Sequence, residues 1–145
     1  MMAGRRVVFD TGSLVSAALR ASSPADRALA LALRHGVVCV CGQTMQRLRA
    51  ALSTSKFDRY MRKSARMAFA EMLLRNAWVC PVSPAGQPKP RSAFRNRRNY
   101  LVLALAVVGE ADVIVSGDTG LLARKAWRRI PIMTPAEFID RFDPA

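Results

Sequence analysis

Two short apolar runs, each followed by an aspartate, constrain most strongly what this chain can fold into. The first starts at Arg6 and leads into Asp10, then a hydroxyl residue and a glycine; the second starts at Val113 and leads through Ser116 to Asp118. Both indicate buried strands that end in small and acidic residues. Ligands bind at the carboxyl ends of parallel strands in open α/β sheets. We therefore expect Asp10 and Asp118 to share one crevice.

Strand and helix patterns alternate along the rest of the chain. Besides the strands at 6–10 and 113–116, apolar runs predict strands at 37–41, 78–80 and 130–133. Helical spacing and capping residues predict helices at 13–20, 25–35, 44–52, 56–61, 64–76, 100–109, 119–125 and 135–141. This alternation predicts an α/β fold with a mainly parallel central sheet of about five strands, covered by helices on both faces. Residues 1–145 form a single domain in this interpretation.

Composition narrows the classes of function. No run of about 18 uncharged apolar residues is present, so we expect no membrane span. One histidine and three cysteines without a Cys-x-x-Cys motif make a zinc site unexpected. We interpret the cysteines as small buried hydrophobes in a reducing, cytoplasmic protein.

Charge is the strongest compositional signal. Twenty-three Lys and Arg residues oppose ten Asp and Glu residues, for a formal net charge of +13. Such an excess favours a polyanionic partner, either nucleic acid or an acidic protein, although a merely basic surface is the plainer alternative. One stretch combines arginines with the aromatic residues Phe94 and Tyr100, a composition suited to phosphate contacts and base stacking. Its arginines are Arg91, Arg95, Arg97 and Arg98.

Several ordered motifs together resemble one family. They are Val7-Val8-Phe9-Asp10-Thr11, Lys56-Phe57-Asp58-Arg59-Tyr60, the stretch 111–118 with Leu121-Leu122, and the closing stretch 132–138. Over nearly its whole length the chain resembles the PIN domain family, most closely the toxin components of toxin–antitoxin systems. The resemblance implies a three-layer α/β/α sandwich, endoribonuclease ancestry, Mg²⁺ or Mn²⁺ as cofactor, an antitoxin partner and, commonly, a homodimer.

The resemblance also implies four acidic positions, and this chain keeps only two of them. Asp10 and Asp118 match the acids after the first and fourth strands. Arg47 stands before a leucine where the family has glutamate, and Asn96 and Asn99 stand where the family has aspartates. Asp10 and Asp118 are thus the expected metal ligands if any metal binds, with Asn99 as a remnant of the catalytic set.

Elementary electrostatics indicates what these replacements do. Four acids would give the crevice a charge of −4, whereas two aspartates and Arg47 give −1. A guanidinium about 5 Å from a divalent ion costs on the order of several kcal/mol at an effective dielectric near 20. We expect Arg47 to pair with Asp10 or Asp118 and to replace the metal as their counter-charge. Asp118 also suits a helix N-cap, as does either Asn96 or Asn99 for a helix starting at Tyr100.

Three hypotheses follow for function. The leading one is a PIN-fold, toxin-like protein that binds RNA or other nucleic acid and has strongly reduced or lost ribonuclease activity. The first alternative is an active metal-dependent ribonuclease with a minimal site of Asp10, Asp118 and Asn99. The second is a non-catalytic partner of an acidic, antitoxin-like protein.

Overall fold

The computed structural model describes residues 2–82 and 98–143 and has a central six-stranded sheet. The strand order is β3-β2-β1-β4-β6-β5, and every neighbouring pair is parallel except β5–β6. The strands are β1 (Arg6–Phe9), β2 (Val37–Val40), β3 (Trp78–Val79), β4 (Val113–Val115), β5 (Ala126–Trp127) and β6 (Ile130–Met133). A mostly parallel α/β fold was predicted from the sequence and is confirmed.

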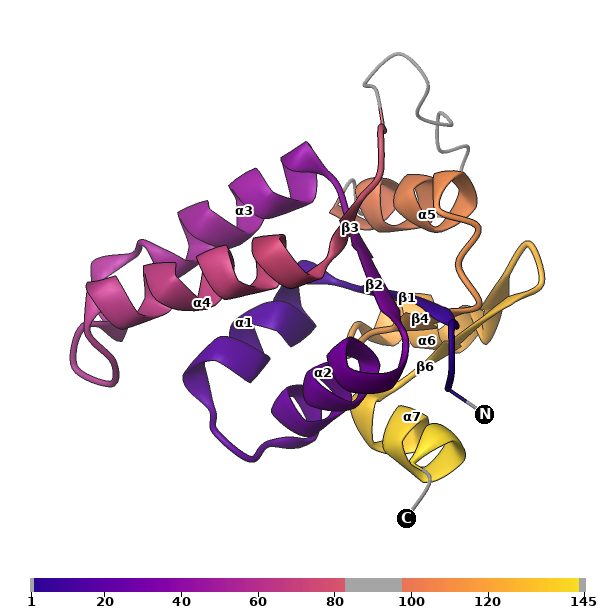
Figure 1. Cartoon of the computed structure of the whole chain (residues 1–145), viewed down its shortest axis with the longest axis horizontal. Helices are drawn as coiled ribbons and strands as arrows, with labels where there is room; N and C mark the ends of the chain where they lie inside the picture. Colours follow the sequence, from indigo (N-terminus) through magenta and orange to yellow (C-terminus); the bar gives the residue numbers. More distant parts are fainter. Residues whose placement is uncertain (1, 83–97, 144–145) are drawn as a thin grey trace.

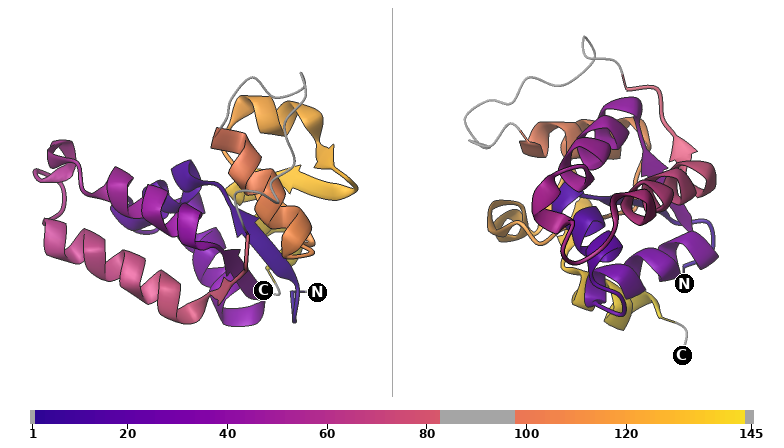
Figure 2. Two further views of the ribbon diagram at one scale, coloured as in Figure 1. Left: turned by 90° about the horizontal axis from the view of Figure 1, so that it is seen from above. Right: turned by 90° about the vertical axis from the view of Figure 1, so that its left-hand side faces the viewer.

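Helices cover both faces of this sheet and give a three-layer arrangement (Figures 1 and 2). One outer layer is formed by α5 and α6, and the other by α1, α2 and α7 with the adjoining α3–α4 pair. The helices are α1 (Thr11–Leu19), α2 (Pro24–His35), α3 (Gly42–Leu52), the 3₁₀ turn η1 (Ser55–Phe57), α4 (Lys63–Asn76), α5 (Arg98–Val108), α6 (Thr119–Arg124) and α7 (Pro135–Phe142). None of the helices in residues 2–82 and 98–143 combines the length and apolar character needed to cross a bilayer.

Strand alternation divides the interior into two cores. Val7 and Phe9 of β1 face the layer of α1, α2 and α7, whereas Val8 faces α5 and α6. All three are almost completely buried, which explains why the strands are continuously apolar rather than alternating with polar residues. The helix α5 is apolar nearly all round because it fills the second core.

The strand order reverses between β1 and β4. From β1 the chain builds the sheet outward through β2 to β3, and from β4 it builds outward the other way through β6. Such a switch point leaves a crevice beyond the carboxyl ends of the two central strands. Phe9 of β1 pairs in register with Val115 of β4, so both strands end at the same level.

A sixth strand was missed from the sequence. The region after 119–124 was predicted as helix up to Lys125, but Lys125 adopts a positive φ of 65° and ends α6. A hairpin follows, in which Arg128 and Arg129 form the two-residue turn with φ values of 47° and 69° between β5 and β6. Two-residue turns of this kind usually carry Asn or Gly, so the Arg128-Arg129 pair gave no sign of a hairpin in the sequence.

Helix boundaries also differ from the predictions. The first helix begins at Thr11 rather than at residue 13, and α5 begins at Arg98 rather than Tyr100. Asn99 therefore lies inside the first turn of α5 and is not its N-cap. The helix predicted at 56–61 is only the short turn η1, followed by backbone turns to Met61.

Candidate functional site

A cleft of about 1010 Å³ lies at the switch point between β1 and β4. One of its walls consists of the residues that follow the central strands, including Asp10 and Asp118, with Asn99 of α5. A second wall comes from α3 and η1, with Arg47, Thr54 and Lys56 among its residues. We call these the sheet-end wall and the helical wall. The cleft thus brings together residues that are more than 100 positions apart in the sequence.

Both carboxylate oxygens of Asp10 accept hydrogen bonds. It is the N-cap of α1, and its Oδ1 accepts a hydrogen bond of 2.8 Å from the backbone N–H of Ser13. Its Oδ2 accepts a hydrogen bond of 2.5 Å from the hydroxyl of Ser116. With 9% of its surface exposed, Asp10 is nearly buried, and both of its oxygens already have partners.

Asp118 plays the matching part at the end of β4. It is the N-cap of α6, and its Oδ2 accepts hydrogen bonds from the backbone N–H of Leu121 at 2.9 Å and from Nδ2 of Asn99 at 3.3 Å. The backbone N–H of Asp118 donates to Ser116 Oγ at 2.9 Å. Ser116 is completely buried and links the two aspartates in one hydrogen-bond chain.

The helical wall is cationic and partly aromatic. Arg47 projects from α3 and is exposed, and Lys56 and Phe57 lie in η1. The Lys56 ammonium lies 5.1 Å from the centroid of the Phe57 ring, within the range of a cation–π contact. The wall therefore offers positive charge and an aromatic face.

The donor set does not fit the four-acid metal site that the resemblance implies. Among the described lining residues the charged ones are Asp10, Asp118, Arg47 and Lys56, so the formal charge is zero. Asn99 turns its amide nitrogen, a hydrogen-bond donor, toward Asp118. Over residues 2–82 and 98–143, no three His, Cys, Asp or Glu side chains converge as metal ligands. Mg²⁺ needs carboxylate charge to offset its dehydration, and this cleft supplies little of it.

No other described acid completes the site. Three further acids, Asp58, Glu71 and Glu110, are absent from the described lining of the cleft. They form ion pairs as follows: Asp58 with Arg66, Glu71 with Arg49, and Glu110 with Arg6.

The cysteines offer no reactive alternative. Cys39, Cys41 and Cys80 are buried free thiols in the core beneath α5. Burial raises the pKa of the Cys39 thiol to about 12, and it raises the pKa of Cys80 as well. Because the thiolate is the nucleophile, Cys39 and Cys80 are inert core residues near neutral pH.

Part of the predicted basic segment lies outside the described residues. This holds for Arg91, Arg95, Asn96 and Arg97. Arg98 is the first residue of α5, but its side chain is not among those described.

Sequence reasoning underrated three residues of the site. In the sequence, Ser116 has no predicted role beyond its place before Asp118, and Lys56 and Phe57 stand out only as part of a family motif. The motif itself was the available signal for Lys56 and Phe57. No pattern in the sequence could show that the Ser116 hydroxyl joins two strand ends.

Comparison with known proteins agrees with this geometry. The model of the PIN domain family matches residues 6–120. The chain belongs to the PIN domain family. Its fold is similar to that of VapBC2 from Rickettsia felis, solved bound to a DNA fragment from its promoter. The likeness covers 88% of this chain and 96% of that chain, with a TM-score of 0.64 and 13% identity. No curated protein matches the sequence.

Proposed function

We propose that this PIN-domain protein binds nucleic acid and has strongly reduced or lost metal-dependent ribonuclease activity. The observation that carries the proposal is the neutral cleft, in which Arg47 and Lys56 balance Asp10 and Asp118. A metal-aided phosphodiesterase needs a cation to polarise the phosphate and activate water. Here the side chains of two cations line the same cleft as the two acids. Such a cleft holds a divalent metal less strongly than one lined by four acids.

The hydrogen bonds of the acids support the same proposal. Asp10 and Asp118 cap helices and accept bonds from Ser116 and Asn99, so folding alone accounts for both carboxylates. The overall charge of +13 favours a polyanionic partner. Nucleic-acid binding therefore remains after catalysis is weakened.

Cleavage of RNA tests the catalytic half of the proposal. Purified wild-type protein and the Asp10→Asn variant are incubated with mixed single-stranded RNAs and Mn²⁺, and products are resolved on denaturing gels. We expect equal, background-level cleavage from both proteins. Cleavage by the wild type that Asp10→Asn abolishes would establish the minimal ribonuclease with Asp10, Asp118 and Asn99 instead.

Salt dependence tests the binding half. Fluorescence anisotropy with labelled RNA should give an affinity that falls steeply with salt, because bound counterions are released from the phosphates. Replacing Arg91, Arg95, Arg97 and Arg98 by glutamine should lower the slope by about one for each phosphate that the protein no longer neutralises. Weak, salt-insensitive binding would contradict this half of the proposal.

A protein-interaction role is the second candidate. The fold neighbour from Rickettsia felis is itself a VapBC complex, and a strongly basic chain suits an acidic partner of the antitoxin type. This role predicts tight binding to an acidic protein together with negligible RNA binding. The salt titration above separates it from the leading proposal.

A further inference from the structure

We propose that residues 54–63 form a docking surface for single-stranded nucleic acid, which leads out of the cleft across η1. We call this surface the basic–aromatic turn. The inference rests on the proposed function and names the form of nucleic acid that the site takes. It is carried by three observations, namely a clamped backbone, exposed aromatic rings beside cations, and continuity with the cleft.

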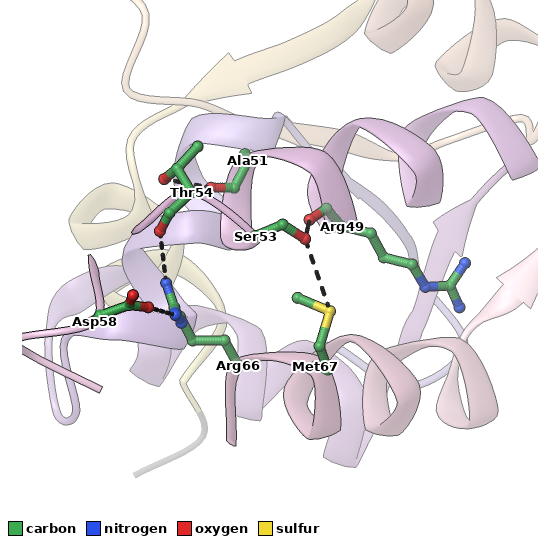
Figure 3. Close-up of polar contacts among 7 residues, drawn as sticks. All are labelled: Arg49, Ala51, Ser53, Thr54, Asp58, Arg66 and Met67. Carbon is green, nitrogen blue, oxygen red and sulfur yellow. Dashed lines mark hydrogen bonds and ion pairs between the residues drawn. The ribbon is translucent and has the colours of Figure 1, made fainter. Parts of the chain in front are cut away.

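A buried arginine clamps this turn to the body of the protein (Figure 3). Arg66 of α4 has no exposed surface, and its guanidinium donates to the backbone carbonyl of Thr54 at 2.9 Å and to the Asp58 carboxylate. These two contacts bracket η1 on both sides. The guanidinium carbon also lies 6.0 Å from the centroid of the Phe57 ring. The clamp therefore presents Lys56 and Phe57 in one preset geometry, which lowers the entropy cost of binding.

Aromatic rings and cations alternate on the surface of the turn. Tyr60 is 73% exposed, an unusual value for a large aromatic residue, and the Arg59 guanidinium lies 5.8 Å from its ring centroid. Phe57 is half-buried in the cleft wall, with Lys56 over its ring. Exposed rings beside cations stack on unpaired bases while the cations contact phosphates. Bases in a duplex are already stacked and paired, so they cannot use these rings.

The charge of the basic–aromatic turn favours a polyanionic partner. Residues 54–66 contain five cations and one acid, and that acid, Asp58, is paired with Arg66. The other four cations are exposed: Lys56, Arg59, Arg62 and Lys63. Thr54, Lys56 and Phe57 also line the cleft, so the turn is continuous with the cleft wall that carries Arg47. An acidic protein partner could use these cations alone, whereas the exposed ring of Tyr60 beside them suits stacking on bases, which points to nucleic acid.

Ring-deleting variants test the inference against a matched control. Labelled oligouridine and an RNA duplex of equal length are titrated with the wild type and with Phe57→Leu, Tyr60→Leu and Trp78→Leu. Trp78 is the control because it is 40% exposed and carries the Arg6 guanidinium over its ring at 4.8 Å, but lies on the edge strand β3. Thermal melting verifies that each variant folds.

We expect the Kd for oligouridine to rise about ten-fold in Phe57→Leu and in Tyr60→Leu, the loss typical of one stacked base. Trp78→Leu should bind oligouridine with the same Kd as the wild type. For the wild type and the three variants alike, the Kd for the duplex should be higher than the wild-type Kd for oligouridine. Lys56→Gln should lower the salt slope by about one, while Arg75→Gln, an exposed site near the end of α4, should leave it unchanged.

The outcomes separate this inference from the proposed function. If the wild type binds oligouridine in a salt-dependent way and the ring variants bind equally well, the docking surface is wrong and the proposed function stands. Preferential binding of the duplex overturns the inference in the same way. If the wild type binds neither probe, both the inference and nucleic-acid binding fail.

Discussion

The two walls of the cleft use charge in opposite ways. On the sheet-end wall, Asp10 and Asp118 are tied down by hydrogen bonds from backbone N–H groups and from Ser116 and Asn99. On the helical wall, Lys56 is exposed, and the buried Arg66 of α4 holds the backbone on either side of η1 from behind. The two carboxylates thus stabilise the fold, whereas the buried guanidinium of Arg66 holds a turn on which other cations are exposed.

We infer from this contrast that a metal site can decay without loss of the fold. A carboxylate at a strand end has two uses, as a metal ligand and as a helix N-cap. When neighbouring acids are replaced, the capping role still favours aspartate at the same position. Under the proposed function, the presence of Asp10 and Asp118 therefore says less about catalysis than the cations that line the same cleft.

The largest effect is expected when two of the family's acids are restored to the cleft. The double variant Arg47→Glu/Asn99→Asp is expected to bind Mn²⁺ at least about three orders of magnitude more tightly than wild type, because it adds three units of negative charge to a neutral cleft. Isothermal titration calorimetry measures the affinity. Arg75→Glu, with a charge reversal outside the described lining, is the control and should match wild type. Tight Mn²⁺ binding by the wild type would remove the contrast between the walls.

Loss of the clamp should have the next largest effect. Arg66→Ala is expected to lower the free energy of unfolding by about 3 kcal/mol, since it empties a buried site and frees the turn around Thr54. Arg49→Ala breaks the exposed ion pair with Glu71 and should cost less than about 1 kcal/mol. Urea denaturation measures both. Equal losses would mean that Arg66 is not a clamp.

The smallest effect is expected on the sheet-end wall. Ser116→Ala should cost about 1–2 kcal/mol, because the Asp118 N–H and an Asp10 oxygen are left without a buried partner. Asp10→Ala should cost about 1–2 kcal/mol through loss of the N-cap and of the acceptor for the Ser116 hydroxyl, and Asp10→Asn should cost less, because Asn keeps the N-cap and loses only that acceptor. The same denaturation series measures these values. A stabilising Asp10→Asn would show that the carboxylate is strained rather than structural.

Much of the site could be predicted from local sequence. Apolar runs located β1 and β4, and the small and acidic residues after them indicated where the helices start. The positions of Arg47 and Asn99 relative to the family motifs indicated which acids are missing. The hairpin at Arg128 and Arg129 escaped prediction because its residues carry none of the usual turn chemistry.

The contacts of the clamp could not have been predicted. Arg66 shares one face of α4 with buried Ala70 and Leu73, so helical spacing alone places it toward the interior, unlike exposed Arg75. Its partners Thr54 and Asp58 lie in the turn before α4. Local periodicity carries no information on which segment covers that face.

By itself, the sequence determined the α/β class, the strand-end aspartates and the excess of positive charge, because these depend on residue type and short-range spacing. Only the tertiary structure decided that Lys56 lines the same cleft as Arg47, Asp10 and Asp118. Electrostatic balance in a cleft depends on distances between segments that meet only after folding, and those distances are set by how the helices pack on the sheet.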